Sequence, residues 1–275
     1  MRFFIGNSDA TGDKMGILES GFFSDDAKNS QDFIKKSYEK YFAEYESLNE
    51  LVHSIFKRSY LLIGESPDKL VIITLYSRIL TSYQSIYHLY GKGYYAEPRI
   101  ILRSLIELVF YLSASINDPK IIQILQLRDE NQKLKSVNRI IKSKTNIKSF
   151  QDKKELETIK NKIEDRMKIF EVADMGIEAI SRIAKMHDFY ITVYSVLCLT
   201  AHHNLTDLET HVVIQNGSIM GLSYGPTDLL LEVNLARSME VLILAMKAME
   251  DSFRLQVKSE LEEKRKIIES YLVQK

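Results

Sequence analysis

The sequence predicts an all-α protein: a bundle of about seven helices with a small β-hairpin inserted before the last core helix. Long segments carry apolar residues at every third or fourth position, which is the period of an amphipathic helix. Four prolines and eleven glycines are few for 275 residues, so little interrupts these helices. Asn216-Gly217, between two short β-type runs, indicates the hairpin.

The first helix is expected after an irregular N-terminal arm. Residues 1–29 contain scattered glycines between Asp and Ser, which favours irregular structure. Ser30 is expected to open a helix that continues to about Leu62. Ser66 and Pro67 form the next start signal, because serine caps a helix and proline suits its first turn.

The central helix is predicted to be the most apolar element of the chain. Pro98 suits its first turn, and from Ile100 to Leu112 only Arg103, Ser104 and Glu107 are strongly polar. A helix that is apolar on nearly all sides is buried, so we expect it to carry two charges into the core.

Arg103 and Glu107 are four residues apart and therefore share one face of that helix. One interpretation is an internal ion pair that fixes helix register. The other is half of an active site, completed by a second helix. Base before acid is the less favourable order for such a pair, which favours the second interpretation.

The remaining elements are expected within a helical domain over residues 30–255. In chain order they are a charged and more exposed helical pair over 118–170, helices over 177–188 and 189–201, the hairpin over 211–224, a last core helix over 229–255, and a charged helical tail over 256–275.

Composition excludes several classes of protein. The 37 basic and 37 acidic residues give zero formal net charge, so no overall charge points to a polyanion. Cys198 is the single cysteine, which excludes an intramolecular disulfide and a cysteine-rich zinc site. The start of the sequence has no signal-peptide pattern, which predicts a cytoplasmic location. Charges interrupt the longest apolar runs, so no membrane partner is expected.

Polar residues that could carry chemistry are most closely spaced after residue 201, in a run that begins with His202 and His203 and ends at His211. One hypothesis is a divalent-metal site of His203, Asp207 and His211, since imidazole and carboxylate are common metal ligands. Another is structural: His202 and His203 end a helix, where the helix dipole favours cations. No cofactor is otherwise expected.

Two motifs carry a resemblance to a known family. Leu102-Arg103-Ser104-Leu105-Ile106-Glu107 is followed much later by Tyr194, seven further residues and His202, and then by Gly225-Pro226. Over residues 40 to 255 the chain resembles a widespread prokaryotic helical domain of unknown function. That domain is in turn similar to the HEPN superfamily of helical bundles.

The HEPN resemblance implies a metal-independent ribonuclease of toxin or anti-phage defence systems, acting as a homodimer on RNA. Such cleavage needs a base, an acid and a cation beside the phosphate. His202 or His203 as acid or base, Arg103 as the clamp on the phosphate and Glu107 as an orienting group would meet these needs. A regulatory or neutralising protein partner stays open, as do two alternatives: a non-catalytic partner- or ligand-binding module and a metal-dependent hydrolase.

The HEPN signature itself, an arginine followed by four to six residues and a histidine, fits a different pair of residues. Arg182 and His187 have this spacing and form an alternative catalytic pair.

Overall fold

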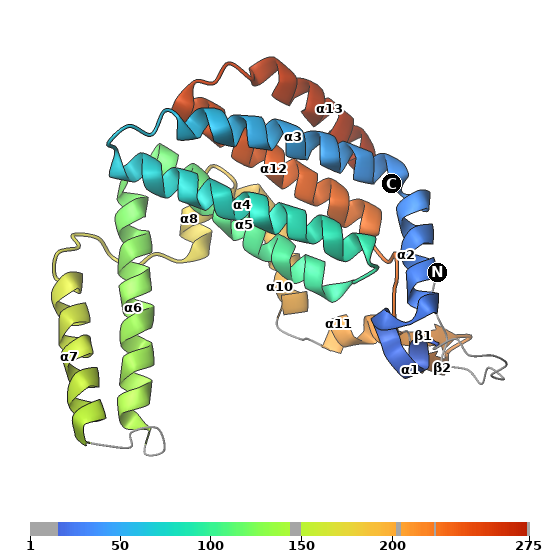
Figure 1. Cartoon of the computed structure of the whole chain (residues 1–275), viewed down its shortest axis with the longest axis horizontal. Coiled ribbons are helices and arrows are strands. Elements are labelled where there is room, and N and C mark those ends of the chain that lie inside the picture. The colour runs from blue at the N-terminus through green and yellow to red at the C-terminus, as the bar shows by residue number, and fades with distance from the viewer. Residues whose placement is uncertain (1–15, 144–149, 202–204, 223, 274–275) are drawn as a thin grey trace.

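The computed structural model describes residues 16–143, 150–201, 205–222 and 224–273 (Figure 1). The described elements are, in order, α1 (Ile17–Ser20), the 3₁₀ helix η1 (Gly21–Phe23), α2 (Asp25–Ser37), α3 (Glu39–Tyr60), α4 (Pro67–Gly91), α5 (Ala96–Asn117), α6 (Lys120–Lys142), α7 (Phe150–Met167), α8 (Ile177–Ile183), α9 (His187–Phe189), the π-helix η2 (Tyr190–Tyr194), α10 (Ser195–Ala201), α11 (Leu205–Leu208), the 3₁₀ helix η3 (Glu209–His211), β1 (Val212–Gln215), β2 (Ser218–Leu222), α12 (Leu231–Phe253) and α13 (Lys258–Val273). The predicted all-α bundle with a small hairpin is confirmed.

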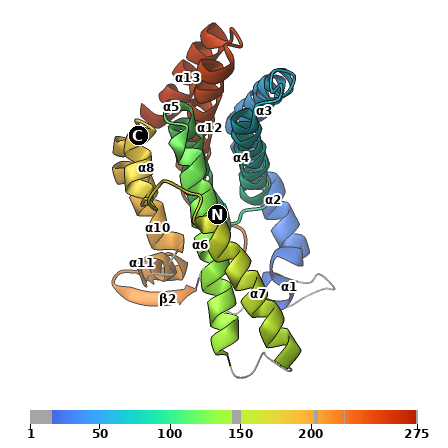
Figure 2. The ribbon, with the colours of Figure 1, turned by 90° about the vertical axis from the view of Figure 1, so that its left-hand side faces the viewer.

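Helices α3, α4, α5 and α12 form the main bundle, in which they lie alongside one another (Figure 1). Helix α13 returns along α12, and its Lys264 bonds Glu44 of α3 at 2.8 Å. Helices α8 and α10 pack against α5 on the side opposite to α3 and α4 (Figure 2). The α6–α7 pair extends away from the bundle, as the view from the side shows (Figure 2).

Local sequence accounts for the α4–α5 hairpin. The Ser66 hydroxyl accepts a bond from the Lys69 amide at 3.4 Å, and Pro67 occupies the first position of α4, as predicted. The chain turns at Gly93, whose φ of 78° lies in the left-handed region. Helix α5 then packs back against α4.

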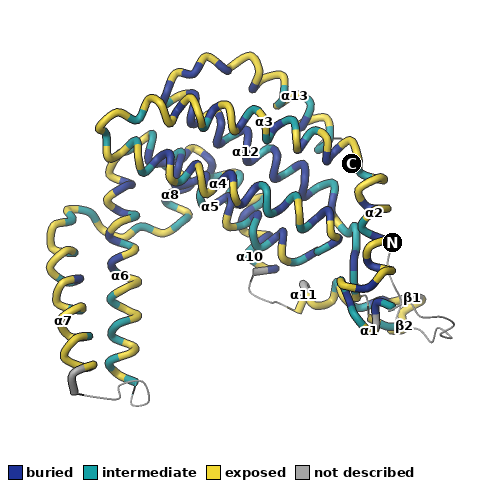
Figure 3. Tube along the Cα trace, viewed as in Figure 1, coloured by how far each residue is buried: buried dark blue, intermediate teal, exposed yellow. Residues whose placement is uncertain are grey.

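Helix α5 is the centre of the core, as its apolar sequence predicts. Its fully buried side chains are Leu102, Leu105, Ile106, Val109, Phe110, Leu112 and Ala114. Figure 3 draws buried residues in dark blue, and they are frequent along α5 and along α12, which packs against it. Of the described helices, α5 is the one long and apolar enough to cross a membrane, with a mean hydropathy of 1.5 over its most apolar window. A core helix has the same property, and α5 packs against α4, α8, α10 and α12.

Two helix boundaries differ from the prediction. The first long helix begins at Asp25 rather than Ser30, because the Ser24 hydroxyl accepts the Ala27 amide at 3.1 Å and caps it. The expected arm over 1–29 is therefore helical from Ile17 onwards, except where η1 and Ser24 interrupt it. The chain also breaks at Tyr38, between α2 and α3, where the Tyr38 hydroxyl bonds Asp228 at 3.0 Å.

The expected helix over 177–188 ends early, at Ile183. Lys185 adopts a left-handed conformation with φ of 59°, which an α-helix does not accommodate. The following helix begins at His187 and includes the π-helical turn η2 before α10.

The hairpin forms at the predicted turn. Asn216 and Gly217 have φ of 52° and 78°, the combination of a type I′ turn, and Gln215 pairs with Ser218. Leu222 ends β2, and the neighbouring Ser223 lies outside the described residues.

The charged segment forms the α6–α7 pair, in which an ion pair links the two helices. Glu130 of α6 is buried, and its Oε2 accepts bonds from Nε and Nη2 of Arg166 in α7 at 3.1 and 2.8 Å. Most other charged residues of this pair are exposed (Figure 3).

Candidate active site between α5 and α10

Arg103 and Glu107 project from α5 into its junction with α10. The Arg103 Nη2 atom lies 3.2 Å from Glu107 Oε1, so the predicted pair is formed. The Arg103 side chain is 22% exposed and the Glu107 side chain is 31% exposed. The expectation that both charges lie inside the core is therefore wrong. Both side chains are long enough to leave the core at its edge while their helix stays buried.

Tyr194 and Cys198 complete the cluster from the opposite side. Nη2 of Arg103 donates to the Tyr194 hydroxyl at 2.7 Å, and its Nε donates to Cys198 Sγ at 3.2 Å. The Tyr194 hydroxyl in turn donates to Glu107 Oε1. One guanidinium therefore contacts a carboxylate, a phenol and a thiol from two helices. Within the described part of the chain, its Nη1 has no hydrogen-bond partner.

The π-helical turn η2 brings Tyr194 to this position. A π-turn contains one more residue than an α-turn, and it often marks a functional site. Ser195 closes the turn, since its hydroxyl donates to the Tyr190 carbonyl at 2.9 Å. The Tyr194 ring stacks on Tyr190, with 5.3 Å between centroids, and contacts Phe110 at 5.9 Å. These rings leave Tyr194 only 3% exposed, so its hydroxyl has a defined position.

The electrostatics keep Arg103 charged and Tyr194 neutral. Burial alone would lower the pKa of Arg103, but the hydrogen bond to Cys198 and the charge of Glu107 outweigh burial and raise it. Burial, and then the hydrogen bond to Glu107, raise the pKa of Tyr194 well above its ordinary value of 10. At neutral pH the cluster therefore offers a fixed cation beside a phenol that keeps its proton.

Two predicted catalytic residues, His202 and His203, lie outside the described residues. They follow Ala201, the last residue of α10. In the sequence His202 is four residues after Cys198. Their role therefore stays a prediction.

The alternative pair, Arg182 and His187, meets at a shared carboxylate. Arg182 Nη2 and His187 Nε2 lie 2.8 and 3.9 Å from Glu178 Oε1. The Ser181 hydroxyl is 3.5 Å from His187 Nδ1, and the His187 ring stacks on Tyr190. The Arg182 side chain is 59% exposed. These two residues are thus close in space but separate from the Arg103 hydrogen bonds.

Two of the three predicted metal ligands lie outside the side chains that the structure describes. His203 lies outside the described residues, and the side chain of Asp207 is not described. His211 ends η3, immediately before β1. Among the described residues there is no group of three or more His, Cys, Asp or Glu side chains that could hold a metal ion.

Tyr194 and Cys198 are the members of the cluster that sequence reasoning did not assign to the site. Tyr194 was the first residue of the second motif, and that motif was the signal for it. Cys198 is four residues further along, which is the spacing of one helical face.

The model of a family of unknown function, DUF5677, matches residues 69–219, which are more than half of the chain. This range contains Arg103, Glu107, Tyr194 and Cys198. Comparison with curated proteins and with solved structures found no match in either set.

Proposed function

We propose that this chain, which belongs to the DUF5677 family, is a HEPN-like ribonuclease that cleaves RNA without a metal ion. One observation carries the proposal: Arg103 is oriented by three partners from two helices and keeps Nη1 for a ligand. A preorganised guanidinium in a partly buried site is suited to the charge that builds on a phosphoryl group.

The proposed reaction is an internal transfer of the phosphoryl group. The 2′-hydroxyl oxygen attacks phosphorus, the bond to the 5′-oxygen breaks, and a 2′,3′-cyclic phosphate forms. A base takes the proton of the 2′-hydroxyl, and an acid gives a proton to the leaving 5′-oxygen, so the proton count balances. We assign these two roles to His202 and His203, because an imidazole titrates near neutral pH.

In this proposal Arg103 contacts the non-bridging phosphoryl oxygens. Glu107 and Tyr194 are positioning residues, since both bond the guanidinium and Tyr194 keeps its proton at neutral pH. Loss of their bonds would let the guanidinium move away from the phosphate, and misplacement by about 1 Å costs roughly 10²-fold in rate.

The test is cleavage of labelled total tRNA and messenger RNA by the full chain, with and without EDTA. We expect EDTA-resistant cleavage that falls about 10²-fold or more in Arg103→Ala and in the His202→Ala/His203→Ala double variant. Arg237→Ala is the matched control, because Arg237 also pairs with a nearby glutamate, Glu240, at 2.7 Å and is similarly part-exposed. Full activity in both site variants would refute the assignment. Activity lost with EDTA would favour the metal-dependent hydrolase instead.

The homodimer implied by the HEPN resemblance is part of the proposal, and one observation supports it. Ile191, Val196 and Leu199, on η2 and α10, are 54%, 51% and 48% exposed. Such apolar exposure beside the site suits an interface with a second copy. Light scattering should give a dimer that Val196→Asp converts to a monomer. A monomeric wild-type protein would contradict it.

A cytoplasmic location and a role in antiviral defence also stay proposals, as does the alternative of a non-catalytic module. That alternative has its own observation: the bonds of Arg103 to Glu107, Tyr194 and Cys198 join α5 to the helix beside it, as a purely structural residue would. Under it, Arg103→Ala lowers thermal stability, and neither tRNA nor messenger RNA is cleaved by the wild-type chain.

A further inference from the structure

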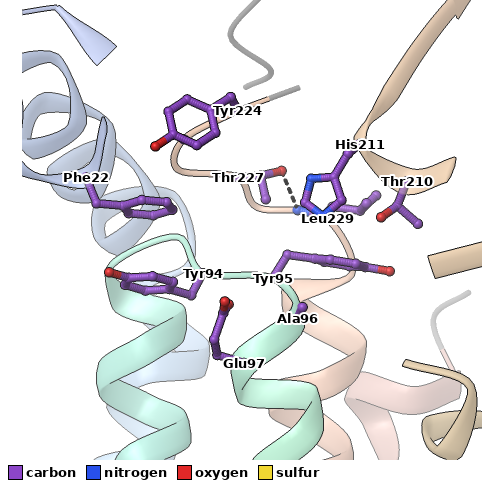
Figure 4. A pocket seen from close by; sticks show the side chains of 11 residues that line it. Phe22, Tyr94, Tyr95, Ala96, Glu97, Thr210, His211, Tyr224, Thr227 and Leu229 are labelled. Atoms are coloured by element: carbon purple, nitrogen blue, oxygen red, sulfur yellow. Dashed lines mark hydrogen bonds between the residues drawn. The ribbon is translucent and has the colours of Figure 1, made fainter. Parts of the chain in front are cut away.

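A pocket of about 200 Å³ opens at the N-terminal end of α5, away from the Arg103 cluster (Figure 4). Its walls come from segments that are distant in sequence: Phe22 of η1, Tyr94 and Tyr95 just before α5, Glu97 in the first turn of α5, and Tyr224 beyond β2. The volume is below the roughly 300–1,000 Å³ of pockets for drug-sized ligands, so it suits one planar ring system.

Close backbone packing holds these walls together. The Thr227 amide donates to the Gly93 carbonyl at 2.9 Å, which joins the α4–α5 turn to the segment before α12. Gly93 has a φ of 78°, and a Cβ there would lie 2.6 Å from Pro226. Gly21 likewise leaves room for the Tyr224 hydroxyl, which a Cβ would meet at 2.8 Å. The pocket is therefore defined by the fold rather than by surface side chains alone.

Aromatic rings line much of the pocket. Phe22 and Tyr94 stack in parallel, with centroids 4.1 Å apart and an interplanar angle of 4°. Tyr95 lies across the pocket from this stack, below His211 and Thr210 (Figure 4). Unpaired RNA bases bind by stacking on such side chains.

Glu97 supplies the specific polar group. Figure 4 shows its side chain rising between Tyr94 and Tyr95. It forms no ion pair or hydrogen bond with any described residue. An ionised carboxylate has acceptors only, so two adjacent N–H donors on a ring edge satisfy it best.

Among the four RNA bases, guanine alone presents two adjacent donors, N1–H and the 2-amino group, on its pairing edge. Adenine and cytosine place an acceptor beside the amino group, and uracil has a single N–H between two carbonyls. We propose that this pocket binds guanine, which stacks against the Phe22–Tyr94 pair and donates both N–H groups to Glu97.

The pocket and the Arg103 cluster share one helix. Tyr95, Arg99 and Arg103 follow one another at four-residue spacing, and Tyr95 and Arg103 are about 12 Å apart along the axis. Arg99 joins them, since its Nη1 donates to the Tyr95 hydroxyl at 2.6 Å. That the guanine belongs to the RNA being cleaved rests on the proposed function; binding of guanine itself does not.

The test is a calorimetric titration of the full chain with the 5′-monophosphates of guanosine, inosine, adenosine, cytidine and uridine. Inosine lacks the 2-amino group and so isolates the second donor. We expect guanosine monophosphate to bind about tenfold or more tighter than the other four. Glu97→Gln should remove this preference, and Phe22→Ala should weaken all binding about tenfold.

Asp68→Asn is the matched control, because Asp68 is also an acid in the first turn of a long helix and is distant in sequence from every pocket residue. It should leave binding unchanged. Glu97→Asp, which keeps the carboxylate, should retain part of the preference if Glu97→Gln does not fold. Equal affinity for all five nucleotides, no binding, or a guanine preference that survives in Glu97→Gln would each overturn the proposal.

This readout contains no cleavage step, so the two proposals fail separately. A preference for guanine without any RNA cleavage would support the guanine pocket and refute the proposed ribonuclease activity. Cleavage that depends on Arg103, without guanine preference in binding, would do the reverse.

Discussion

The Tyr194 hydroxyl lies 2.7 Å from Nη2 of Arg103, although the two residues are 91 positions apart. The same hydroxyl donates to Glu107, which Arg103 also contacts. Tyr194 thus links both charged residues of α5 to the π-helical turn, and the geometry of the cluster depends on it.

Tyr194→Phe should separate the position of Arg103 from its charge. The ring packing remains, but two hydrogen bonds are lost, which costs about 1 kcal/mol in the free energy of unfolding. We expect RNA cleavage to fall by roughly 10²-fold, because Arg103 loses one of its anchors. Thermal unfolding and single-turnover cleavage measure the two effects. Tyr190→Phe, which keeps the ring stack, is the control, and equal activity of both variants would contradict the role of Tyr194.

Arg103→Lys should be nearly as inactive as Arg103→Ala. Lysine keeps the positive charge, but its ammonium cannot reach a thiol, a phenol and a carboxylate in the planar arrangement that the guanidinium uses. Cleavage by this variant within threefold of the wild-type rate would show that charge alone is sufficient. Arg237→Lys, on α12, should leave cleavage unchanged.

Gly93→Ala should destabilise the protein more than Gly64→Ala. Both glycines have positive φ, of 78° and 58°, so each substitution costs about 1–2 kcal/mol of backbone strain. At Gly93 a Cβ would also lie 2.8 Å from the Pro226 backbone, whereas nothing lies within 4 Å at Gly64. The difference in the free energy of unfolding between the two variants, measured by chemical denaturation, isolates the effect of the clash. Equal losses of stability would show that the α4–α5 turn accommodates the added Cβ without a further energetic cost.

The Glu130–Arg166 bond should make the α6–α7 pair sensitive to acid. The hydrogen bond from Arg166 lowers the pKa of Glu130 below its ordinary 4.5. A lowered pKa in the folded state stabilises the fold above pH 4.5, and this contribution is lost as the pH falls through the folded value.

Arg166→Met should therefore cost about 1 kcal/mol at pH 7 and progressively less below pH 4.5. Arg265→Met is the control, since Arg265 pairs only with exposed carboxylates on α13. Hydrogen exchange of α6 amides between pH 3.5 and 7 would follow the effect, and a pH-independent cost would contradict it.

Local signals predicted a large part of the fold. The Asn216-Gly217 turn is correct because its positive φ values are a property of those two residues. The start of α4 at Pro67 follows from Ser66, which caps it. The start of the first long helix was wrong, because Ser24, and not Ser30, is the serine whose hydroxyl reaches an unpaired amide.

The candidate site was predicted in part. The pairing of Arg103 with Glu107 follows from their spacing on one helix. The partial exposure of the two side chains does not follow from their spacing, because it depends on where α10 packs against α5. Arg182 and His187 were expected to act together, and their link through Glu178 joins residues that are all within ten positions.

By itself the sequence determined the helical class, the apolar centre of α5 and the Arg103–Glu107 pair, since periodicity and four-residue spacing are properties of one segment. Tertiary structure alone decided that Tyr194 and Cys198 meet Arg103, and that Phe22, Glu97 and Tyr224 surround one pocket. Such contacts join segments many positions apart. They depend on the packing of whole helices, which minimises exposed apolar surface over the entire core and leaves no signal in any single stretch.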